Sequence, residues 1–182
     1  FLTGVTKFSQ VSVFSGFNQP LDISMTEKFE ALCGITEEEL HTQFAEPIRK
    51  MAESDGCTEE DIRQKLKRHY DGYHFSKNMA DIYNPFSLLN AFYNNDVRDY
   101  WFTSGTPSYL IRLMNHFHEG IDELTNKFYL PDEFINYKAD VEYPLPMIYQ
   151  SGYLTIKDYD KESNLFLLDF PNNEVKSGFL AM

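Results

Sequence analysis

The side chains most able to do chemistry in this sequence are its histidines, its cysteines and the residues at two helix starts. His69 and His74 bracket the sequence YDGY, and Asp71 would have to join them across a glycine turn to complete a metal site. That pattern is more typical of a helix end leading into a short ribbon. Neither Cys33 nor Cys57 has a basic neighbour of the kind that activates a thiol nucleophile. These groups alone do not predict catalysis.

The two helix starts offer a more specific chemistry. Asn84-Pro85 and Thr106-Pro107 each place a capping side chain before a proline at the first helical position. Such a start combines a rigid apolar ring, which can pack on adenine, with backbone N–H groups that can face a phosphate. Both pairs are also ordinary good helix starts, so the pattern by itself leaves the binding and the structural interpretation open.

Composition limits the classes of partner. The 182 residues include 28 acidic and 16 basic side chains, which gives a net charge of −12. A surface of this kind repels phosphate backbones and anionic lipid. No apolar run approaches the roughly 20 residues of a membrane-spanning helix, and two cysteines fit a reducing compartment. We therefore expect a soluble cytoplasmic protein, without a membrane partner and with nucleic acid as a poor default partner.

The elements that would position these residues begin with a strand end and several helices. FLTG, at residues 1–4, and the alternating PLDISM, at residues 20–25, predict strand segments from the end of an α/β layer. Thr36 and Thr58 predict helix N-caps, the first within a capping box. Pro47 is expected to kink or split the helix that follows Thr36.

The middle of the chain predicts a ribbon and further helices. YHF and DIY form the ribbon around a turn at residues 76–78, and Gly72 ends the helix before it. The helix from Pro85 is expected to bury Leu88, Leu89 and Phe92. A second helix starts at Pro107, and a weaker pattern indicates helix over residues 120–128.

The last forty residues predict a helix ended by Gly152, strands at 153–159 and 164–170, and a final helix capped by Asn172. Helix, hairpin and helix in this order form the outline of a winged-helix element. The turn KDYDKES carries three acids against two lysines, which is a poor match for a phosphate backbone. The expected fold is mostly α (α+β), divided into residues 1–25, 26–125 and 126–182.

Six segments in order resemble the bacterial AAA-ATPase-like family, and together they cover essentially the whole chain. They are FLTGVTKFSQVSVFSGFNQPLDIS, LCGITEEEL, YDGYHF, YNPFSLLNAF, YWFTSGTPSYLI and YQSGYLTIKDYD…FPNNEV. The resemblance implies an upstream nucleotide-binding core with Walker A and Walker B motifs, a helical lid, a winged-helix element and a downstream nuclease-like domain of the PD-(D/E)XK class. This chain has no GxxxxGK[ST] sequence. The resemblance therefore implies that this chain corresponds to the part between the Walker motifs and the nuclease-like domain.

The resemblance also implies roles for individual residues. Thr3 falls where the family's sensor-1 strand ends in a small polar residue that can read the γ-phosphate or its attacking water. Lys7, in the turn that follows, is expected near phosphate.

Two glycine–proline pairs match the lid motif of related NTPases, in which the proline packs on adenine. Gly72 and Pro85 form the first pair, with the ribbon inserted between them. Gly105 and Pro107 form a more compact second version, which we rank behind the first.

The expected function is the lid and winged-helix portion of an ATPase, acting with ATP and Mg²⁺ that the complete protein binds. For this chain alone we expect neither tight ATP binding nor hydrolysis, because nothing in it cradles the β- and γ-phosphates. A winged-helix nucleic-acid-binding module and a non-catalytic interaction scaffold are the alternatives. The apolar residues of segment 1–25 are further expected to mediate self-association.

Overall fold

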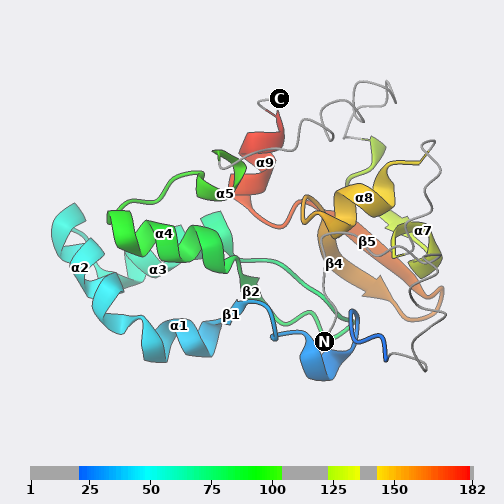
Figure 1. The fold of residues 1–182 in the computed structure, drawn as a ribbon, viewed down its shortest axis with the longest axis horizontal. Coiled ribbons are helices and arrows are strands. Elements are labelled where there is room, and N and C mark those ends of the chain that lie inside the picture. Colours follow the sequence, from blue (N-terminus) through cyan, green and yellow to red (C-terminus); the bar gives the residue numbers. More distant parts are fainter. Residues whose placement is uncertain (1–20, 104–122, 136–142, 181–182) are drawn as a thin grey trace, which may run out of the picture.

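The computed structural model describes residues 21–103, 123–135 and 143–180, which form an α+β fold (Figure 1). The helices are η2 (Glu27–Phe29, a 3-10 turn), α1 (Glu37–Gln43), α2 (Ala45–Asp55), α3 (Glu59–Tyr70), α4 (Pro85–Asn94), α5 (Tyr100–Thr103), α7 (Pro131–Phe134), α8 (Leu145–Gln150) and α9 (Asn173–Leu180). The strands are β1 (Ile35–Thr36), β2 (Ile82–Tyr83), β3 (Lys127–Tyr129), β4 (Thr155–Asp160) and β5 (Leu165–Asp169).

Helices α1 and α3 begin at the two predicted threonine caps. The Thr58 hydroxyl accepts a hydrogen bond from the Asp61 backbone N–H at 3.1 Å, and the Asp61 carboxylate accepts one from the Thr58 N–H at 3.0 Å. Thr36 and Glu39 form the same reciprocal capping box. The predicted break near Pro47 is confirmed, because the helix divides at Phe44 and the proline lies in the first turn of α2.

Removal of the α3 cap tests how much this cap contributes to the free energy of unfolding. Thr58→Ala is expected to lower the free energy of unfolding by about 1 kcal/mol, because the Asp61 N–H loses its acceptor. Thr42→Ala is the matched control, since Thr42 lies inside α1 with an exposed side chain. Urea denaturation should show a change for the first variant and almost none for the second. Equal effects would contradict a capping role.

The first hydrophobic cluster fills the space among α1, α2, α3 and α4. Its buried members are Leu40, Ile48, Met51, Ala52, Ile62, Leu66, Tyr70, Tyr83, Leu88, Ala91 and Tyr100. The prediction for α4 was wrong at Leu89, which is 48% exposed, whereas Ser87 and Ala91 share the buried face with Leu88. Ser87 can be buried because its hydroxyl donates to the Glu174 carboxylate at 2.7 Å.

The predicted ribbon is present only as one bridge. Tyr73 and Ile82 exchange backbone hydrogen bonds of 3.1 and 3.2 Å. Strand β2 pairs instead with β1, with Ile35 opposite Tyr83, so the two-stranded ribbon that we expected from YHF and DIY is replaced by a small antiparallel sheet. The sequence of DIY indicates a strand, but its partner lies about 47 residues upstream, beyond the reach of local pattern.

The second sheet has strand order β3-β5-β4 and is antiparallel throughout. The two hairpin strands agree with their predicted positions to within two residues at each end. Strand β3 corrects the helix expected over residues 120–128: Asn126 has φ +53°, and Phe128 then pairs with Leu167. A left-handed residue just before Lys127-Phe128-Tyr129 suits the start of a strand, so tertiary pairing overrides the weak helical pattern.

The second hydrophobic cluster lies between this sheet and helices α8 and α9. Its buried members are Tyr73, Ile82, Leu124, Tyr129, Phe134, Leu145, Ile148, Tyr153, Leu154, Ile156, Phe166, Leu168, Val175 and Phe179. Helix α9 begins as predicted, because the Asn172 side chain accepts the Val175 N–H at 3.1 Å. In Figure 1, α5 and α9 lie between the α1–α4 helices and the three-stranded sheet. The division at residue 125 stays a prediction.

The start of the described chain is a turn, which corrects the strand-like interpretation of PLDISM. The Asp22 carboxylate accepts hydrogen bonds from the backbone N–H of Ser24 at 3.1 Å and from its hydroxyl at 2.8 Å. This local bonding competes with an extended conformation. The predicted sensor strand and the helix from Pro107 lie outside the described residues.

Candidate functional site

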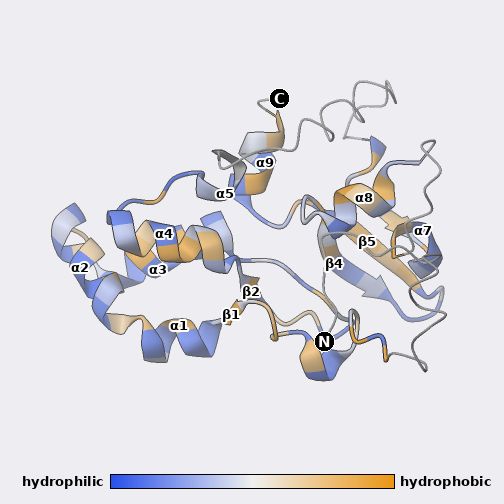
Figure 2. Cartoon of the chain, in the orientation of Figure 1, coloured by the Kyte–Doolittle hydropathy of each residue, from blue (hydrophilic) through white to orange (hydrophobic). Residues whose placement is uncertain are grey.

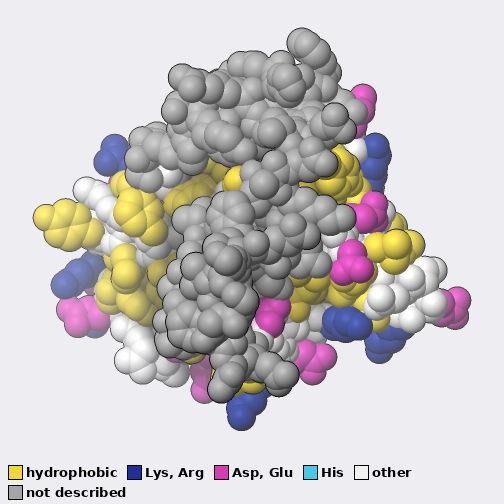
Figure 3. Space-filling model, turned by 45° about the vertical axis from the view of Figure 1, so that its right-hand side comes forward, with side chains coloured by type: hydrophobic (Ala, Val, Ile, Leu, Met, Phe, Trp, Pro, Cys, Tyr) yellow, Lys and Arg dark blue, Asp and Glu magenta, His cyan; other side chains and the backbone are white. Residues whose placement is uncertain are grey.

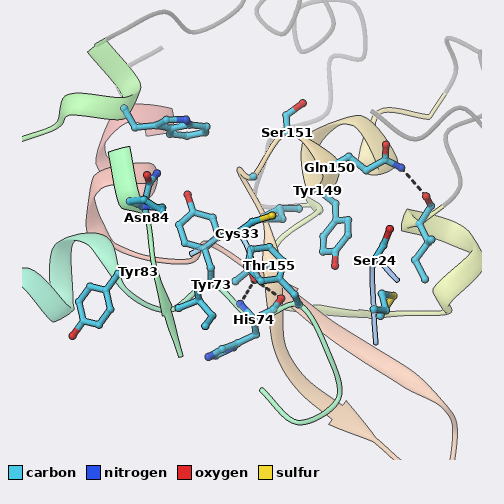
Figure 4. A pocket seen from close by; sticks show the side chains of 18 residues that line it. Ser24, Cys33, Tyr73, His74, Tyr83, Asn84, Tyr149, Gln150, Ser151 and Thr155 are labelled. Atoms are coloured by element: carbon cyan, nitrogen blue, oxygen red, sulfur yellow. Dashed lines mark hydrogen bonds between the residues drawn. The ribbon is translucent and has the colours of Figure 1, made fainter. Parts of the chain in front are cut away.

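A cavity of about 390 Å³ lies at the start of α4, where the two hydrophobic clusters meet. We call it the Pro85 pocket. Its walls come from the segment around Tyr73, the first turn of α4, α5, the α8–β4 connection and the chain near Met25. Figure 4 shows Asn84 and Tyr73 on one side of it, and Tyr149, Gln150 and Ser24 on the other. The volume lies in the range of small-molecule sites.

Pro85 reaches this cavity because Asn84 fixes the start of the helix. The Asn84 side-chain oxygen accepts the N–H groups of Phe86 at 3.0 Å and Ser87 at 3.3 Å. The first free N–H groups of α4 are therefore already bonded. The N–H groups that a phosphate would need are therefore occupied. The Pro85 ring remains available as an apolar packing surface.

Aromatic rings form much of the cavity wall. They belong to Tyr73, Phe75, Trp101 and Tyr149. Gly152, with φ +83°, lies against two of them: a Cβ at this position would be 3.7 Å from the Tyr73 ring and 3.9 Å from the Trp101 ring. The left-handed backbone and the missing side chain together let the turn after α8 approach both rings. Flat apolar walls of this kind suit an aromatic or heteroaromatic ring.

The buried carboxylate of Glu174 fixes both Trp101 and the start of α4. Its two oxygens accept the Trp101 backbone N–H and the Ser87 hydroxyl, each at 2.7 Å. Glu174 is fully buried. Burial raises the pKa of its carboxyl above the ordinary value, and the two hydrogen bonds offset this only in part. One side chain of α9 thus positions residues from two elements of the pocket wall.

The pocket wall is almost free of charge. Among the described residues that line it there is no Lys, Arg, Asp or Glu, and His74 is the one titratable imidazole. Its Nδ1 donates to the Ile156 carbonyl at 2.6 Å, and its Nε2 lies 2.7 Å from the Asp81 carboxylate. The Thr155 hydroxyl accepts the backbone N–H of His74 at 2.8 Å and donates to the His74 carbonyl at 3.0 Å (Figure 4). An uncharged aromatic ligand fits this wall, whereas a phosphate would find no lysine or arginine among the described lining residues.

Gly72 does not lie in the Pro85 pocket. It has φ +90°, and a Cβ there would overlap the carbonyl oxygen of Pro171. The Lys157 ammonium bridges this contact by donating to the carbonyls of Gly72 at 2.9 Å and of Pro171 at 2.8 Å. The structure therefore does not bring the predicted Gly72 and Pro85 together at one surface, and it places Gly72 in a tight backbone junction.

The two histidines considered for a metal site have different partners. His69 Nε2 lies 2.8 Å from the Asp99 carboxylate, whereas His74 bonds Asp81. Asp71 is buried beside Lys67, whose ammonium lies 3.6 Å from its carboxylate. Within the described ranges no set of three His, Cys, Asp or Glu side chains could hold a metal.

Four predicted site residues lie outside the described residues: Thr3, Lys7, Gly105 and Pro107. Pro85 is the predicted residue that lines the pocket, and sequence reasoning missed most of its neighbours. Tyr73, Trp101 and Gly152 all stand in the segments that carry the family resemblance, although the sequence pattern assigned Gly152 only to a helix end. Their clustering in those segments is the signal that could have marked them.

The chain is similar to a longer protein. A protein of Azotobacter chroococcum mcd 1, described as "Uncharacterized protein in vnfD 5'region", is 34% identical over 181 residues. The match covers 97% of this chain, and the chain spans 32% of the length of that relative. No family model and no solved structure matches the chain. The similarity shows relatedness to a longer protein.

Proposed function

We propose that this chain is the lid and winged-helix part of a cytoplasmic AAA-type ATPase. An upstream core with Walker A and Walker B motifs binds Mg²⁺ and the phosphates of ATP, and this chain supplies contacts to the adenine side. A nuclease-like domain follows in the same polypeptide. The observation that carries the proposal is the ring-lined pocket at Pro85, whose described lining has no Lys, Arg, Asp or Glu; it suits a base and leaves the phosphates to another part of the protein.

The connectivity of the C-terminal part supports the winged-helix assignment. Strand β3 is followed by α7 and α8, and the β4–β5 hairpin then returns so that β5 lies between β3 and β4. A strand, two helices and a hairpin joined in this sheet order are the connectivity expected of a winged-helix element. The described helices include none long and apolar enough to cross a membrane.

The alternative of a nucleic-acid-binding module has little support in the side chains. Helix α8, which would enter a groove, carries no cation, and Leu145, Pro146 and Ile148 are buried. Lys157 is directed inward to two carbonyls. The Lys77 ammonium lies 4.3 Å from the centre of the Tyr159 ring and 2.7 Å from its hydroxyl. Phosphate binding needs cations that are free at the surface, and the ammonium of Lys157 is already bonded to two backbone carbonyls.

Substitution of Pro85 tests the adenine contact. In the protein encoded by the complete reading frame, Pro85→Ala is expected to weaken ATP binding by about 1 kcal/mol, or roughly fivefold, because one apolar packing surface is lost. Pro131→Ala is the matched control, since Pro131 also occupies the first position of a helix and does not line the pocket. Calorimetry gives both affinities. Equal affinities for the Pro85 variant and the unmodified protein would contradict the assignment.

Protection of a thiol tests occupancy of the pocket directly. Cys33 lines the Pro85 pocket and Cys57 lies in the turn between α2 and α3, and both are exposed. Saturating ATP should slow alkylation of Cys33 by iodoacetamide several-fold and leave Cys57 unchanged, as followed by peptide mass spectrometry of the complete protein. If Cys33 reacts at the same rate with and without ATP while ATP is bound, the pocket does not hold the nucleotide.

A further inference from the structure

Helix α4 presents a hydrophobic stripe to solvent on the face opposite the core. Phe86, Leu89 and Tyr93 are 47%, 48% and 88% exposed. They follow one another at positions i, i+3 and i+7, so they share one face of the helix. We call these three residues the α4 stripe.

The helix that carries the stripe has no charged residue at all, in a chain of which 24% is charged. Figure 2 shows the contrast between the hydrophobic colour of α4 and the mostly hydrophilic α1. A helix that is apolar on both faces is normally covered on both. The inner face of α4 packs on α2 and α3, and the stripe is the face that remains.

The stripe continues into a groove beside α2. A cavity of about 470 Å³ is lined there by Pro47, Lys50, Phe92, Tyr93 and Asn95. The Phe92 ring stacks on Phe44 with ring centres 5.3 Å apart, which holds the floor of the groove in place. Hydrophobic side chains are exposed on the left of Figure 3, over this part of the molecule. Contiguous patches of this kind mark protein–protein contacts.

We propose that the α4 stripe is the docking surface for the nucleotide-binding core of the same polypeptide. The partner's identity rests on the proposed function. The stripe begins at Phe86, next to Pro85 at the pocket, and the described residues of the pocket wall include no lysine or arginine for phosphates. Groups that bind the phosphates must therefore approach the mouth of the pocket from outside and cover the first turn of α4.

The size of the relative supplies enough chain for such a partner. The matched region is 32% of its length, so about two thirds of that polypeptide lies outside the match. A partner in the same polypeptide is present at a high effective concentration, so an apolar surface of only a few side chains suffices to hold it.

Hydroxyl-radical labelling without nucleotide tests the docking. Oxidation of Phe86 and Tyr93 is compared between the 182-residue chain and the protein encoded by the complete reading frame. Phe128, on β3, is the matched control because its exposure, 47%, equals that of Phe86. We expect at least threefold lower oxidation of Phe86 and Tyr93 in the complete protein, and an unchanged value for Phe128. Unchanged oxidation of Phe86, or equal protection of all three residues, would overturn the proposal.

Two leucines of equal exposure give a second test. Leu89, in the stripe, is 48% exposed, and Leu130, beside α7, is 49% exposed. In the complete protein, Leu89→Lys should restore the oxidation of Phe86 to its level in the 182-residue chain, whereas Leu130→Lys should not. Neither change should alter the circular dichroism melt of the 182-residue chain. Persistent protection in the Leu89 variant would contradict docking through the stripe.

The two proposals fail in different ways. Protection of the stripe with no effect of ATP on Cys33 would keep the docking surface and remove the adenine role of the pocket. ATP protection of Cys33 with a fully labelled stripe would keep the nucleotide site and overturn the docking surface.

Discussion

Glu174→Ala is expected to lower the free energy of unfolding by about 4 kcal/mol. The Ser87 hydroxyl and the Trp101 N–H would lose their acceptor inside the protein, and each buried unpaired donor costs about 1–3 kcal/mol. Removal of a buried, hydrogen-bonded carboxylate is among the larger single-residue losses for this reason. Chemical denaturation followed by circular dichroism measures the change. A loss below about 1 kcal/mol would show that α4, α5 and α9 are held together without the Glu174 contacts.

Glu174→Gln is the matched control for Glu174→Ala. Its amide oxygen can accept the Trp101 N–H, and its NH₂ group can donate to the Ser87 hydroxyl oxygen, so both contacts are kept. The control should therefore be at least as stable as the unmodified protein at pH 7, since it no longer buries a charge. If the glutamine variant is as unstable as the alanine variant, the carboxylate has a role other than bridging these donors.

Comparison of the unmodified protein with Glu174→Gln also predicts that the free energy of unfolding depends on pH. The pKa of Glu174 is raised in the folded state, first by burial, above its ordinary value of 4.5. Its protonation therefore adds stability that is fully present below pH 4.5 and is lost as the pH rises through the higher folded-state pKa. The stability of the unmodified protein relative to Glu174→Gln should fall as the pH is raised across this window. The difference between the two proteins removes the contribution of Asp71, whose pKa burial also raises.

Gly72→Ala is expected to destabilise the protein by about 3 kcal/mol. An alanine at φ +90° costs about 1–2 kcal/mol, and its Cβ would overlap the Pro171 carbonyl, which cannot move without disturbing the Lys157 bridge. Gly56→Ala is the matched control: it has φ +66° and nothing within 4 Å of a Cβ, so it should show the backbone cost alone. Thermal denaturation of both variants measures the difference. A loss no larger than that of Gly56→Ala would contradict the tight junction.

The result also decides between two roles for Gly72. A residue of the adenine site would change ATP affinity with little effect on stability, whereas a junction residue changes stability first. The structure favours the second, because Gly72 contacts Pro171 and Lys157 and does not line the Pro85 pocket.

Features of the fold that depend on neighbouring residues could be predicted from the sequence. The caps at Thr36, Thr58, Asn84 and Asn172 form as expected, because each bonds backbone groups within three residues. The same holds for the break near Pro47 and for the hairpin strands. Such signals are local, so the sequence contains them completely.

Features that depend on distant partners could not be predicted in this way. The exposed position of Leu89 follows from Ser87, which is buried because Glu174 lies 87 residues further along the chain. Strand β3 exists because β5 pairs with it. The pocket gathers Pro85, Tyr73 and Gly152 from separate segments, and periodicity within one segment cannot indicate that they meet.

The Gly72–Pro171 junction has a consequence for the order of assembly during synthesis. Asn172 donates to the Asp71 carbonyl, 101 residues away, and Lys157 and Glu174 reach back across 85 and 87 residues to Gly72 and Ser87. Helices α1 to α4 leave the ribosome long before these partners. Their caps and local contacts form first, while the Ser87 hydroxyl and the end of α3 stay open to water. Helices α3 and α4 therefore gain these contacts only when α9 emerges. The folding of helices α1 to α4 is thereby coupled to the folding of the three-stranded sheet.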